Sequence, residues 1–219
     1  ATLPLAATAT DEEYTVTATR VARDALRTPL AISTVEQQDI QRRQMLGLDE
    51  ALGRVPGVFF QNRYNFAQDV RVSIRGFGAR SQFGIRGIKI FVDGIPSTLP
   101  DGQGGVDDID LGSASRIEVI RGPAAALYGA SAGGVMNIFT EDGGDRPFVE
   151  AGVNLGEFGF GRYNVKTGGQ TGALNYLVNA SYMDMDGYRD HSAVEHGMIN
   201  SKFRYDFADG SALTAIVNA

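Results

Sequence analysis

The chain has 219 residues and a formal net charge of −6, and its sequence pI of about 4.9 argues against a nucleic-acid binder, which must neutralise phosphates. It contains no cysteine, which excludes disulfides and thiolate metal sites, and its 28 glycines predict many tight turns. No apolar run reaches the roughly 18 residues of a transmembrane helix, so a role in a membrane would have to use β-strands.

Residues 1–19 are predicted to form a flexible N-terminal segment. Residues 1–10 are small and rich in Ala and Thr, and residues 3–7 are compatible with the tail of a signal peptide. After two glutamates, the side chains alternate as in a strand, through the residues Tyr14, Thr15, Val16, Thr17 and Ala18.

The next part of the chain is predicted to form a strand and two short helices. Residues 28–33 suit a strand, and Thr34 and Gln37 have the spacing of a capping box for a helix that ends near Arg43. A second helix ends before Pro56. Its apolar face consists of Leu48, Ala51, Leu52 and Val55.

Residues 70–76 and 88–96 are predicted to be strands, each with a glycine turn. The loops after them, residues 77–87 and 97–110, have the composition of exposed loops. Four aspartates in the second loop suggest calcium, but they do not follow the EF-hand pattern, whose twelfth position would here be Gly112 instead of Glu. These aspartates are Asp101, Asp107, Asp108 and Asp110.

Residues 116–141, with the sequence RIEVIRGPAAALYGASAGGVMNIFTE, are predicted to form two strands around a short helical turn. Gly122-Pro123 ends the first strand, because proline cannot donate the next ladder hydrogen bond. The glycines that follow do not form a phosphate loop, because no Lys or Arg follows them between Gly129 and Gly134.

From residue 147 onward the chain is predicted to form about five long strands, each with one apolar and one polar face. Residues 149–155 begin this pattern, and residues 213–217 begin its last strand. Both a transmembrane barrel wall and a soluble sandwich show this period of two, so the pattern alone leaves both open.

The motifs RIEVIRGP, ALYG, AGGV and NIFT in residues 116–140, together with LDEALGRVPGV in residues 48–58, resemble the plug domain of TonB-dependent outer-membrane receptors. The resemblance implies an α+β plug domain, with a small mixed sheet and short helices, in residues 20–145. It implies that residues 146–219 are the first antiparallel strands of a transmembrane β-barrel. Barrels of this family have about 22 strands, so the wall read here is incomplete.

The resemblance also implies functional residues. Residues 14–18 resemble the TonB box, which pairs by strand addition with the energy-transducing protein TonB. Arg75 and Arg121 match plug arginines that form salt bridges with barrel glutamates. The loop residues expected to contact a ligand are Arg63, Arg80, Phe83, Arg86 and Asp101.

The function implied is ligand-gated active transport across the outer membrane of a Gram-negative bacterium, with the plug inside the barrel and facing the periplasm. The partners would be TonB, membrane lipid and a scarce small molecule. Residues 57–112 and 187–192 resemble a subgroup that includes the pyrroloquinoline quinone importer and probable iron-siderophore receptors, which leaves both ligands open. A ligand-sensing receptor without transport is the alternative.

Neither an enzyme nor a bound cofactor is predicted. No arrangement of Ser, His and Asp and no pair of carboxylates has a supporting motif. His191 and His196 are the only histidines, and no third ligand lies near them in the sequence, so no metal site is predicted.

Overall fold

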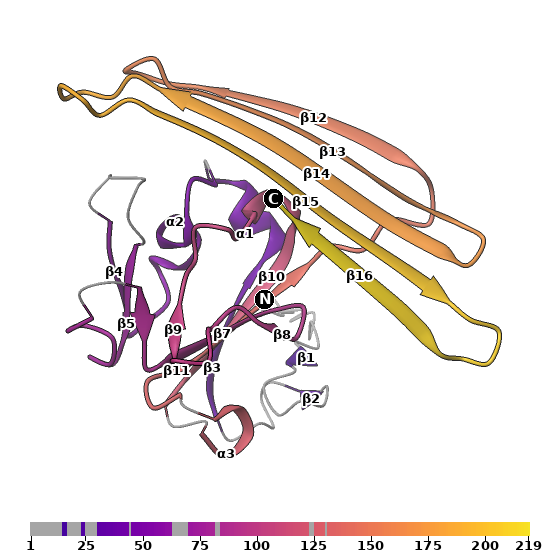
Figure 1. Ribbon diagram of the computed structural model, residues 1–219, viewed down its shortest axis with the longest axis horizontal. Coiled ribbons are helices and arrows are strands. Elements are labelled where there is room, and N and C mark those ends of the chain that lie inside the picture. Colours follow the sequence, from indigo (N-terminus) through magenta and orange to yellow (C-terminus); the bar gives the residue numbers. More distant parts are fainter. Residues whose placement is uncertain are drawn as a thin grey trace, which may run out of the picture.

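The computed structural model describes residues 15–16, 23–24, 30–43, 45–62, 70–81, 84–122, 125–129 and 131–219. Figure 1 shows two regions, a small mixed sheet with short helices and a long curved sheet that lies over it. The first region contains β1 (Thr15–Val16), β2 (Arg23–Asp24), β3 (Ala31–Glu36), α1 (Gln37–Gln41), α2 (Leu48–Leu52), β4 (Val58–Gln61), β5 (Arg71–Ile74), β6 (Ile85–Arg86), β7 (Ile88–Val92), β8 (Ile95–Pro96), β9 (Gln103–Gly104), η2 (Leu111–Ser113), β10 (Ala114–Arg121), α3 (Ala125–Tyr128) and β11 (Gly134–Thr140). The long sheet, called the wall below, contains β12 (Phe148–Leu155), β13 (Gly161–Thr171), β14 (Leu174–Met185), β15 (Val194–Asp206) and β16 (Ala212–Asn218).

The mixed sheet has the strand order β3–β10–β11–β7–β8, which places β10 and β11 near its centre. β10 is antiparallel to both of its neighbours, whereas β11 is parallel to β7. The two strands are rich in apolar and β-branched residues, as expected for strands that are covered on both faces. The predicted mixed sheet with short helices is confirmed.

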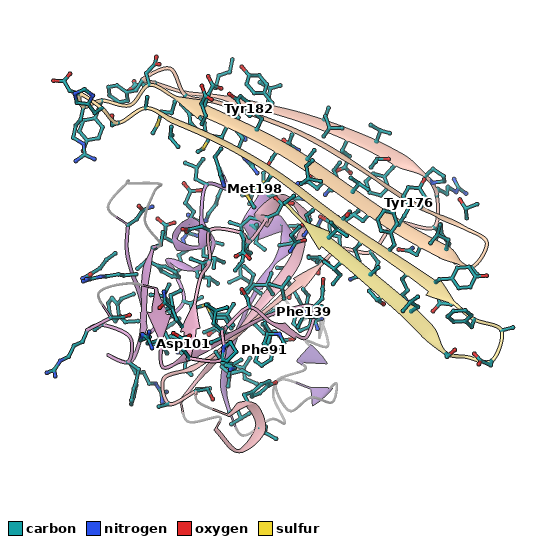
Figure 2. The ribbon with its side chains drawn as sticks, viewed as in Figure 1. Phe91, Asp101, Phe139, Tyr176, Tyr182 and Met198 are labelled. Atoms are coloured by element: carbon teal, nitrogen blue, oxygen red, sulfur yellow. The ribbon has the colours of Figure 1, made fainter. Side chains whose placement is uncertain are left out.

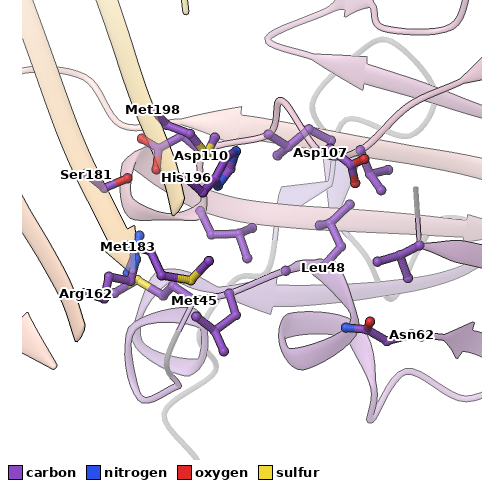
Figure 3. A pocket seen from close by; sticks show the side chains of 16 residues that line it. Met45, Leu48, Asn62, Asp107, Asp110, Arg162, Ser181, Met183, His196 and Met198 are labelled. Carbon is purple, nitrogen blue, oxygen red and sulfur yellow. The ribbon is translucent and has the colours of Figure 1, made fainter. Parts of the chain in front are cut away.

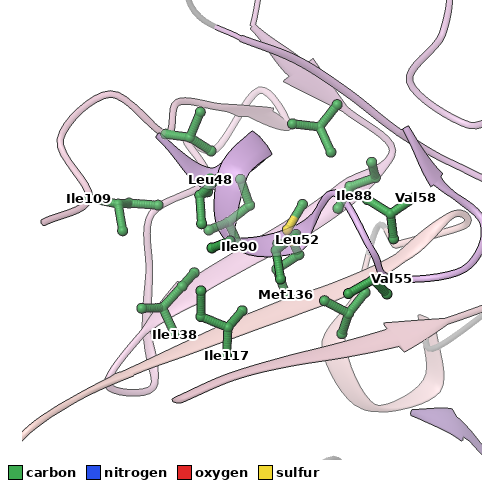
Figure 4. Close-up of a cluster of buried hydrophobic side chains, with 14 of the residues drawn as sticks. Leu48, Leu52, Val55, Val58, Ile88, Ile90, Ile109, Ile117, Met136 and Ile138 are labelled. Atoms are coloured by element: carbon green, nitrogen blue, oxygen red, sulfur yellow. The ribbon is translucent and has the colours of Figure 1, made fainter. Parts of the chain in front are cut away.

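One face of the mixed sheet carries the main apolar core. Alternate residues of β7, β10 and β11 point to this face, and α2 covers them with the apolar side that the sequence predicts (Figure 4). On the opposite face Phe91 and Tyr128 pack together with their ring centroids 5.4 Å apart. The most deeply buried residues of the main core include Leu48, Leu52, Ile88, Ile90, Ile117, Val119, Met136 and Ile138.

The predicted capping box at Thr34 is wrong. Thr34 lies inside β3, opposite Glu118 of β10, and α1 begins only after Glu36, which makes no side-chain cap. Hydrogen bonding along β10 therefore outweighs the local capping signal, which is worth only about 1 kcal/mol.

The strand predicted at residues 88–96 is instead two short strands. β7 ends at Val92, the chain turns at Asp93 and Gly94, and β8 pairs back on β7. Both turn residues have positive φ, 48° and 81°, which is the conformation of a two-residue hairpin turn with an Asp-Gly sequence.

The wall is an antiparallel sheet with its strands in sequence order, which confirms the predicted antiparallel strands; they do not close into a barrel within this chain. Its side chains alternate, so that Tyr182 lies on the side away from the first region and Met198 on the side toward it (Figure 2). None of the helices in the described part of the chain is long and apolar enough to span a membrane. Exposed apolar residues on the far side of the wall include Val149, Val153, Leu155, Tyr163, Val165, Ile199, Phe203, Leu213 and Val217.

Different short strands of the first region lie near the two ends of the wall. In Figure 1 the short strands β1 and β2 lie toward the end where the turns after β13 and β15 are found. The β4–β5 hairpin lies toward the opposite end, with the turns after β12 and β14. Thr15 and Val16, the described residues of the predicted N-terminal box, therefore lie toward the end of the wall opposite the β4–β5 hairpin.

Candidate functional site

The first region is joined to the inner face of the wall by buried charged groups. Lys166 of β13 has a side chain that is 4% exposed, and its Nζ lies 2.7 Å from Oε1 of Glu141 and 3.4 Å from Oε2 of Glu150. Burial raises the pKa of the Glu141 carboxyl above its ordinary value, and the hydrogen bond and charge of Lys166 oppose that shift. Lys166 therefore compensates a carboxylate that is costly to bury.

A second lysine of the wall, Lys202, binds the residues on either side of Glu141, in the segment that joins β11 to the wall. Nζ of Lys202, on β15, lies 2.8 Å from Oδ1 of Asp142 and 3.6 Å from Oδ1 of Asp93, and it donates a hydrogen bond of 3.4 Å to the carbonyl of Thr140. Asp93 also accepts hydrogen bonds from the backbone N–H and the hydroxyl of Thr140. Lys202 thus connects the β7–β8 turn and the end of β11 to the wall.

Asn175 of β14 completes this attachment. Its Oδ1 accepts a 2.8 Å hydrogen bond from the backbone N–H of Gly143, and its Nδ2 donates a 2.7 Å hydrogen bond to the carbonyl of the same residue. A Cβ atom at Gly143 would lie 2.2 Å from the carbonyl oxygen of Tyr176, so only glycine allows this approach.

A separate polar contact joins the turn η2 to the middle of the wall. Oδ1 of Asp110 accepts a 3.0 Å hydrogen bond from the backbone N–H of Gly112, and its Oδ2 accepts a 2.7 Å hydrogen bond from Nδ2 of Asn179. A Cβ at Gly112 would lie 2.7 Å from that Nδ2 atom. Gly112, which fails as a calcium ligand, is therefore needed for close packing of the loop on the wall.

Beside this contact lies a cavity of about 80 Å³ between the two regions (Figure 3). The first region lines it with Met45, Leu48 and Asp107 among others, and the wall lines it with Arg162, Met183, His196 and Met198. Arg162 is 5% exposed and is attracted electrostatically to Asp110 and Glu50. The cavity is mixed in character, with thioether and aliphatic groups around a few charged ones.

Two of the predicted ligand-contact residues lie together. Nη2 of Arg86 lies 3.3 Å from Oδ2 of Asp101 and donates a 3.1 Å hydrogen bond to Oε1 of Gln103, and Nη1 donates a 3.2 Å hydrogen bond to the carbonyl of Asp101. Both side chains of this ion pair are about half exposed. Arg80 is also exposed, whereas Arg63 and Phe83 lie outside the described residues.

Arg75 and Arg121 lie at one corner of the first region. Arg121 donates hydrogen bonds of 2.9 Å to the carbonyl of Pro56 and 3.1 Å to the hydroxyl of Ser33. The exposed Arg75 has φ 50°, and its Nη1 lies 3.4 Å from the place of a Cβ on the neighbouring Gly122. Among the described residues neither guanidinium forms an ion pair, so the expected glutamate partners stay a prediction.

The predicted TonB box is only partly described. Thr15 and Val16 form β1, which pairs in an antiparallel hairpin with Asp24 and Arg23 of β2. This agrees with the predicted strand character of these two residues. Tyr14, Thr17 and Ala18 lie outside the described residues.

The sequence interpretation missed the lysines and asparagines that hold the two regions together. Lys166 and Lys202 occupy the polar face in the period-two pattern, so their direction could have been predicted. Their acidic partners could not, because Glu141 and Asp93 are 25 and 109 positions away along the chain and only the fold brings them close.

Comparison with known proteins agrees with this architecture. The family model described as TonB-dependent Receptor Plug Domain matches residues 24–135. The pyoverdine outer membrane receptor FpvA from Pseudomonas aeruginosa PAO1, solved bound to pyoverdine, is similar in structure with a TM-score of 0.77 and 20% identity, over 93% of this chain and 29% of that one. The siderophore receptor PirA from Pseudomonas aeruginosa has a TM-score of 0.65 and 26% identity, over 88% of this chain and 34% of its own.

The alcaligin outer membrane receptor FauA from Bordetella pertussis is also similar, with a TM-score of 0.75 and 19% identity, over 93% of this chain and 34% of its own. The chain thus spans about a third or less of the length of these solved structures. By their descriptions FpvA and FauA are outer membrane receptors, and PirA is a siderophore receptor. With its mixed sheet, its seat against a polar wall face and a family match over residues 24–135, the chain belongs to the TonB-dependent receptor plug domain family.

Proposed function

We propose that this chain is the plug and the first wall strands of a receptor that imports a ferric siderophore across the outer membrane. The observation that carries the proposal is the seat of the described part of the plug against the polar inner face of the wall. Lys166 and Lys202 hold it there, while the opposite face of the wall is apolar. A wall that is polar inside and apolar outside suits a barrel in lipid, and a plug attached to its inner face would block the lumen.

TonB would act at the periplasmic end. The box at residues 14–18 would pair with TonB by adding a strand, since Thr15 and Val16 already adopt a strand conformation. Force on this segment would move the plug and open the lumen. Arg75 and Arg121 would then be released from the barrel glutamates that hold them in the resting state.

The ligand would bind at the other end, over the loops that carry Arg63, Arg80, Phe83, Arg86 and Asp101. Siderophore is favoured over pyrroloquinoline quinone because the similar receptors of known structure include one bound to pyoverdine and one in complex with enterobactin. Arg86 is also paired with Asp101, so its guanidinium offers less positive charge to the three carboxylates of the quinone than the sequence alone suggests.

Growth of a receptor-deficient strain that carries the full-length gene tests this proposal. We expect rescue on limiting chelated iron, with uptake of radioactive iron, and no rescue on limiting quinone. Deletion of residues 12–18 should abolish uptake and leave ligand binding intact, because only the TonB contact is lost. Ligand binding without uptake in the unaltered receptor would favour the sensing receptor instead.

A further inference from the structure

The cavity of about 80 Å³ between the plug and the wall is rich in sulfur, and it is called the thioether cavity below. Three of the five methionines of the chain line it, Met45 from the plug and Met183 and Met198 from the wall. The imidazole of His196 lines it as well, and Figure 3 shows these side chains around the cavity. Methionine also fills gaps in apolar cores, so the arrangement of these groups decides between packing and binding.

The wall places two thioethers beside the imidazole. Met183 of β14 lies directly opposite His196 of β15 in the antiparallel register, so their Cβ atoms are about 4.5–5.5 Å apart on the same face of the sheet. Met198 follows His196 by two positions on β15 and therefore points to that face too. Met183 is 5% exposed, whereas the exposed His196 leaves a way in for an ion. The strand register thus holds two sulfur donors and one nitrogen donor as a single cluster.

The plug adds the third thioether from a constrained position. Met45 has φ 56°, a left-handed conformation that is uncommon for a residue other than glycine. The chain after it is held in place, because the backbone N–H of Leu46 donates a 3.4 Å hydrogen bond to Oε2 of Glu50. Residues with such backbone strain cluster at functional sites. The strained backbone at Met45 therefore fits a side chain that is aimed into the cavity for binding.

Thioether sulfur selects soft metal ions. Met side chains suit Cu(I), and imidazole also suits copper, whereas carboxylates and carbonyl groups suit Mg²⁺, Ca²⁺ or Mn²⁺. Because thioethers and a neutral imidazole carry no charge, they cannot compensate a buried double charge, so the cavity favours a monovalent ion. Arg162 also lines the cavity, and the carboxylates of Asp110 and Glu50 attract it and compensate its charge. Among the described residues no group of three or more His, Cys, Asp or Glu side chains could hold a metal ion, which argues against zinc.

We propose that the thioether cavity binds one Cu(I) ion through the sulfur atoms of Met45, Met183 and Met198 and a ring nitrogen of His196. The ion would connect the plug to the wall, since one ligand comes from the plug and the others from two strands of the wall. The expectation of no metal site counted ligands near the histidines in the sequence, and the fold brings Met45 to His196 from far along the chain. This site goes beyond the import of a siderophore and does not depend on it.

Methionine-to-leucine variants of the full-length receptor test the proposal. Met45→Leu, Met183→Leu and Met198→Leu each replace a thioether by an aliphatic group of similar volume, so the fold should be retained. Met185→Leu is the matched control, because it makes the same change on β14 at a residue that does not line the cavity. Under anaerobic conditions, with bicinchoninate-bound Cu(I) as the probe, the unaltered receptor and M185L should take up one more equivalent of Cu(I) than M45L/M183L/M198L.

The single variants measure what each thioether contributes. We expect each of them to bind Cu(I) at least about tenfold more weakly, because even a group that only orients a metal ligand contributes about 10–100-fold to metal affinity. X-ray absorption at the copper edge should show sulfur neighbours in the unaltered receptor and fewer of them in each variant. A methionine that only packs against its neighbours would change neither measurement.

Equal uptake of Cu(I) by the unaltered receptor and by M45L/M183L/M198L would overturn the inference, and so would a copper spectrum with only nitrogen and oxygen neighbours. Where the triple variant fails to fold, the single variants decide. Ag(I), which is also soft, should compete for the same equivalent, and an excess of Zn(II) should not; displacement of Cu(I) by Zn(II) would contradict thioether ligation. Growth on chelated iron reports on siderophore import separately, so either proposal can fail while the other stands.

Discussion

The strands of the plug and of the wall both alternate apolar and polar side chains, but the apolar side chains of the two regions face different surroundings. In the plug, the apolar residues of β7, β10 and β11 meet under α2, and the core is closed on itself. In the wall, apolar residues such as Val149 and Leu155 remain 74% exposed, and the buried side chains include Arg162, Lys166 and Asn200. The plug is thus stabilised by its own core, whereas in the proposed receptor the wall would have lipid on its apolar face and the plug on its polar face.

This comparison predicts that charged groups matter most where the two regions meet. Lys166→Met would leave the largely buried carboxylate of Glu141 without its cationic partner and with only the side chain of Gln37 as a hydrogen-bond partner, at a cost of about 3–5 kcal/mol. We expect faster hydrogen exchange in residues 140–143 of the full-length receptor, measured by mass spectrometry.

The control for this prediction is a pair on the plug surface. Arg42 and Asp39 form an ion pair with side chains 73% and 63% exposed, so Arg42→Met should cost less than about 1 kcal/mol. The double variant K166M/E141M should restore most of the protection. If K166M alone exchanged as slowly as the unaltered receptor, the ion pair would not hold the plug.

The second prediction concerns the apolar side of the comparison. Ile90 is fully buried in the plug core, so Ile90→Ala should destabilise the plug by about 2–5 kcal/mol through lost contacts and a cavity. Val165→Ala removes apolar volume from the far face of the wall, where the side chain is 51% exposed and lipid can fill the space. Urea unfolding of the receptor in lipid vesicles should show a lower midpoint for the plug variant alone, and equal midpoints would mean that the core does not stabilise the plug independently.

The sequence predicts the repeating parts of this fold and misses the contacts between them. The regular alternation from Val149 to Leu155 predicts the strands, and the resemblance of the preceding residues to a plug favours a barrel wall over a soluble sandwich. The sequence predicts Thr34 as a helix cap and not as a strand residue, because its strand partner, Glu118, is remote in the sequence. The polar contacts of Asp110 with Asn179, and of Lys202 with Asp142, depend on how the two regions dock, and no local pattern encodes that docking.

The third prediction tests how closely the two regions approach. Gly112→Ala would place a Cβ atom 2.7 Å from Nδ2 of Asn179, so the loop must move, at a cost of about 1–3 kcal/mol. Gly197→Ala is the control on the wall, since its nearest neighbour would be 3.9 Å away. We expect a lower thermal midpoint only for G112A. A normal midpoint for G112A would show that the loop does not rest on the wall.

The smallest effect is expected at Glu50 of α2, which the plug only half buries. Burial raises the pKa of its carboxyl above the ordinary value, with a smaller opposing contribution from a hydrogen bond of the Leu46 backbone N–H. Because the folded-state pKa is the higher one, the stabilising contribution of the protonated form is present below the unfolded-state pKa and is lost as pH rises through the folded-state pKa. Glu50→Gln should remove this loss of stability. We therefore measure the protection of residues 48–53 against hydrogen exchange, corrected for the intrinsic effect of pH. Protection should fall between mildly acidic and neutral pH in the unaltered receptor but not in the variant. Asp39→Asn on the exposed surface of α1 is the control and should leave the fall unchanged. If α2 of the unaltered receptor is equally protected at both pH values, water screens the Glu50 carboxylate fully. In that case burial at this position of α2 costs no more than it does on the exposed surface of the plug.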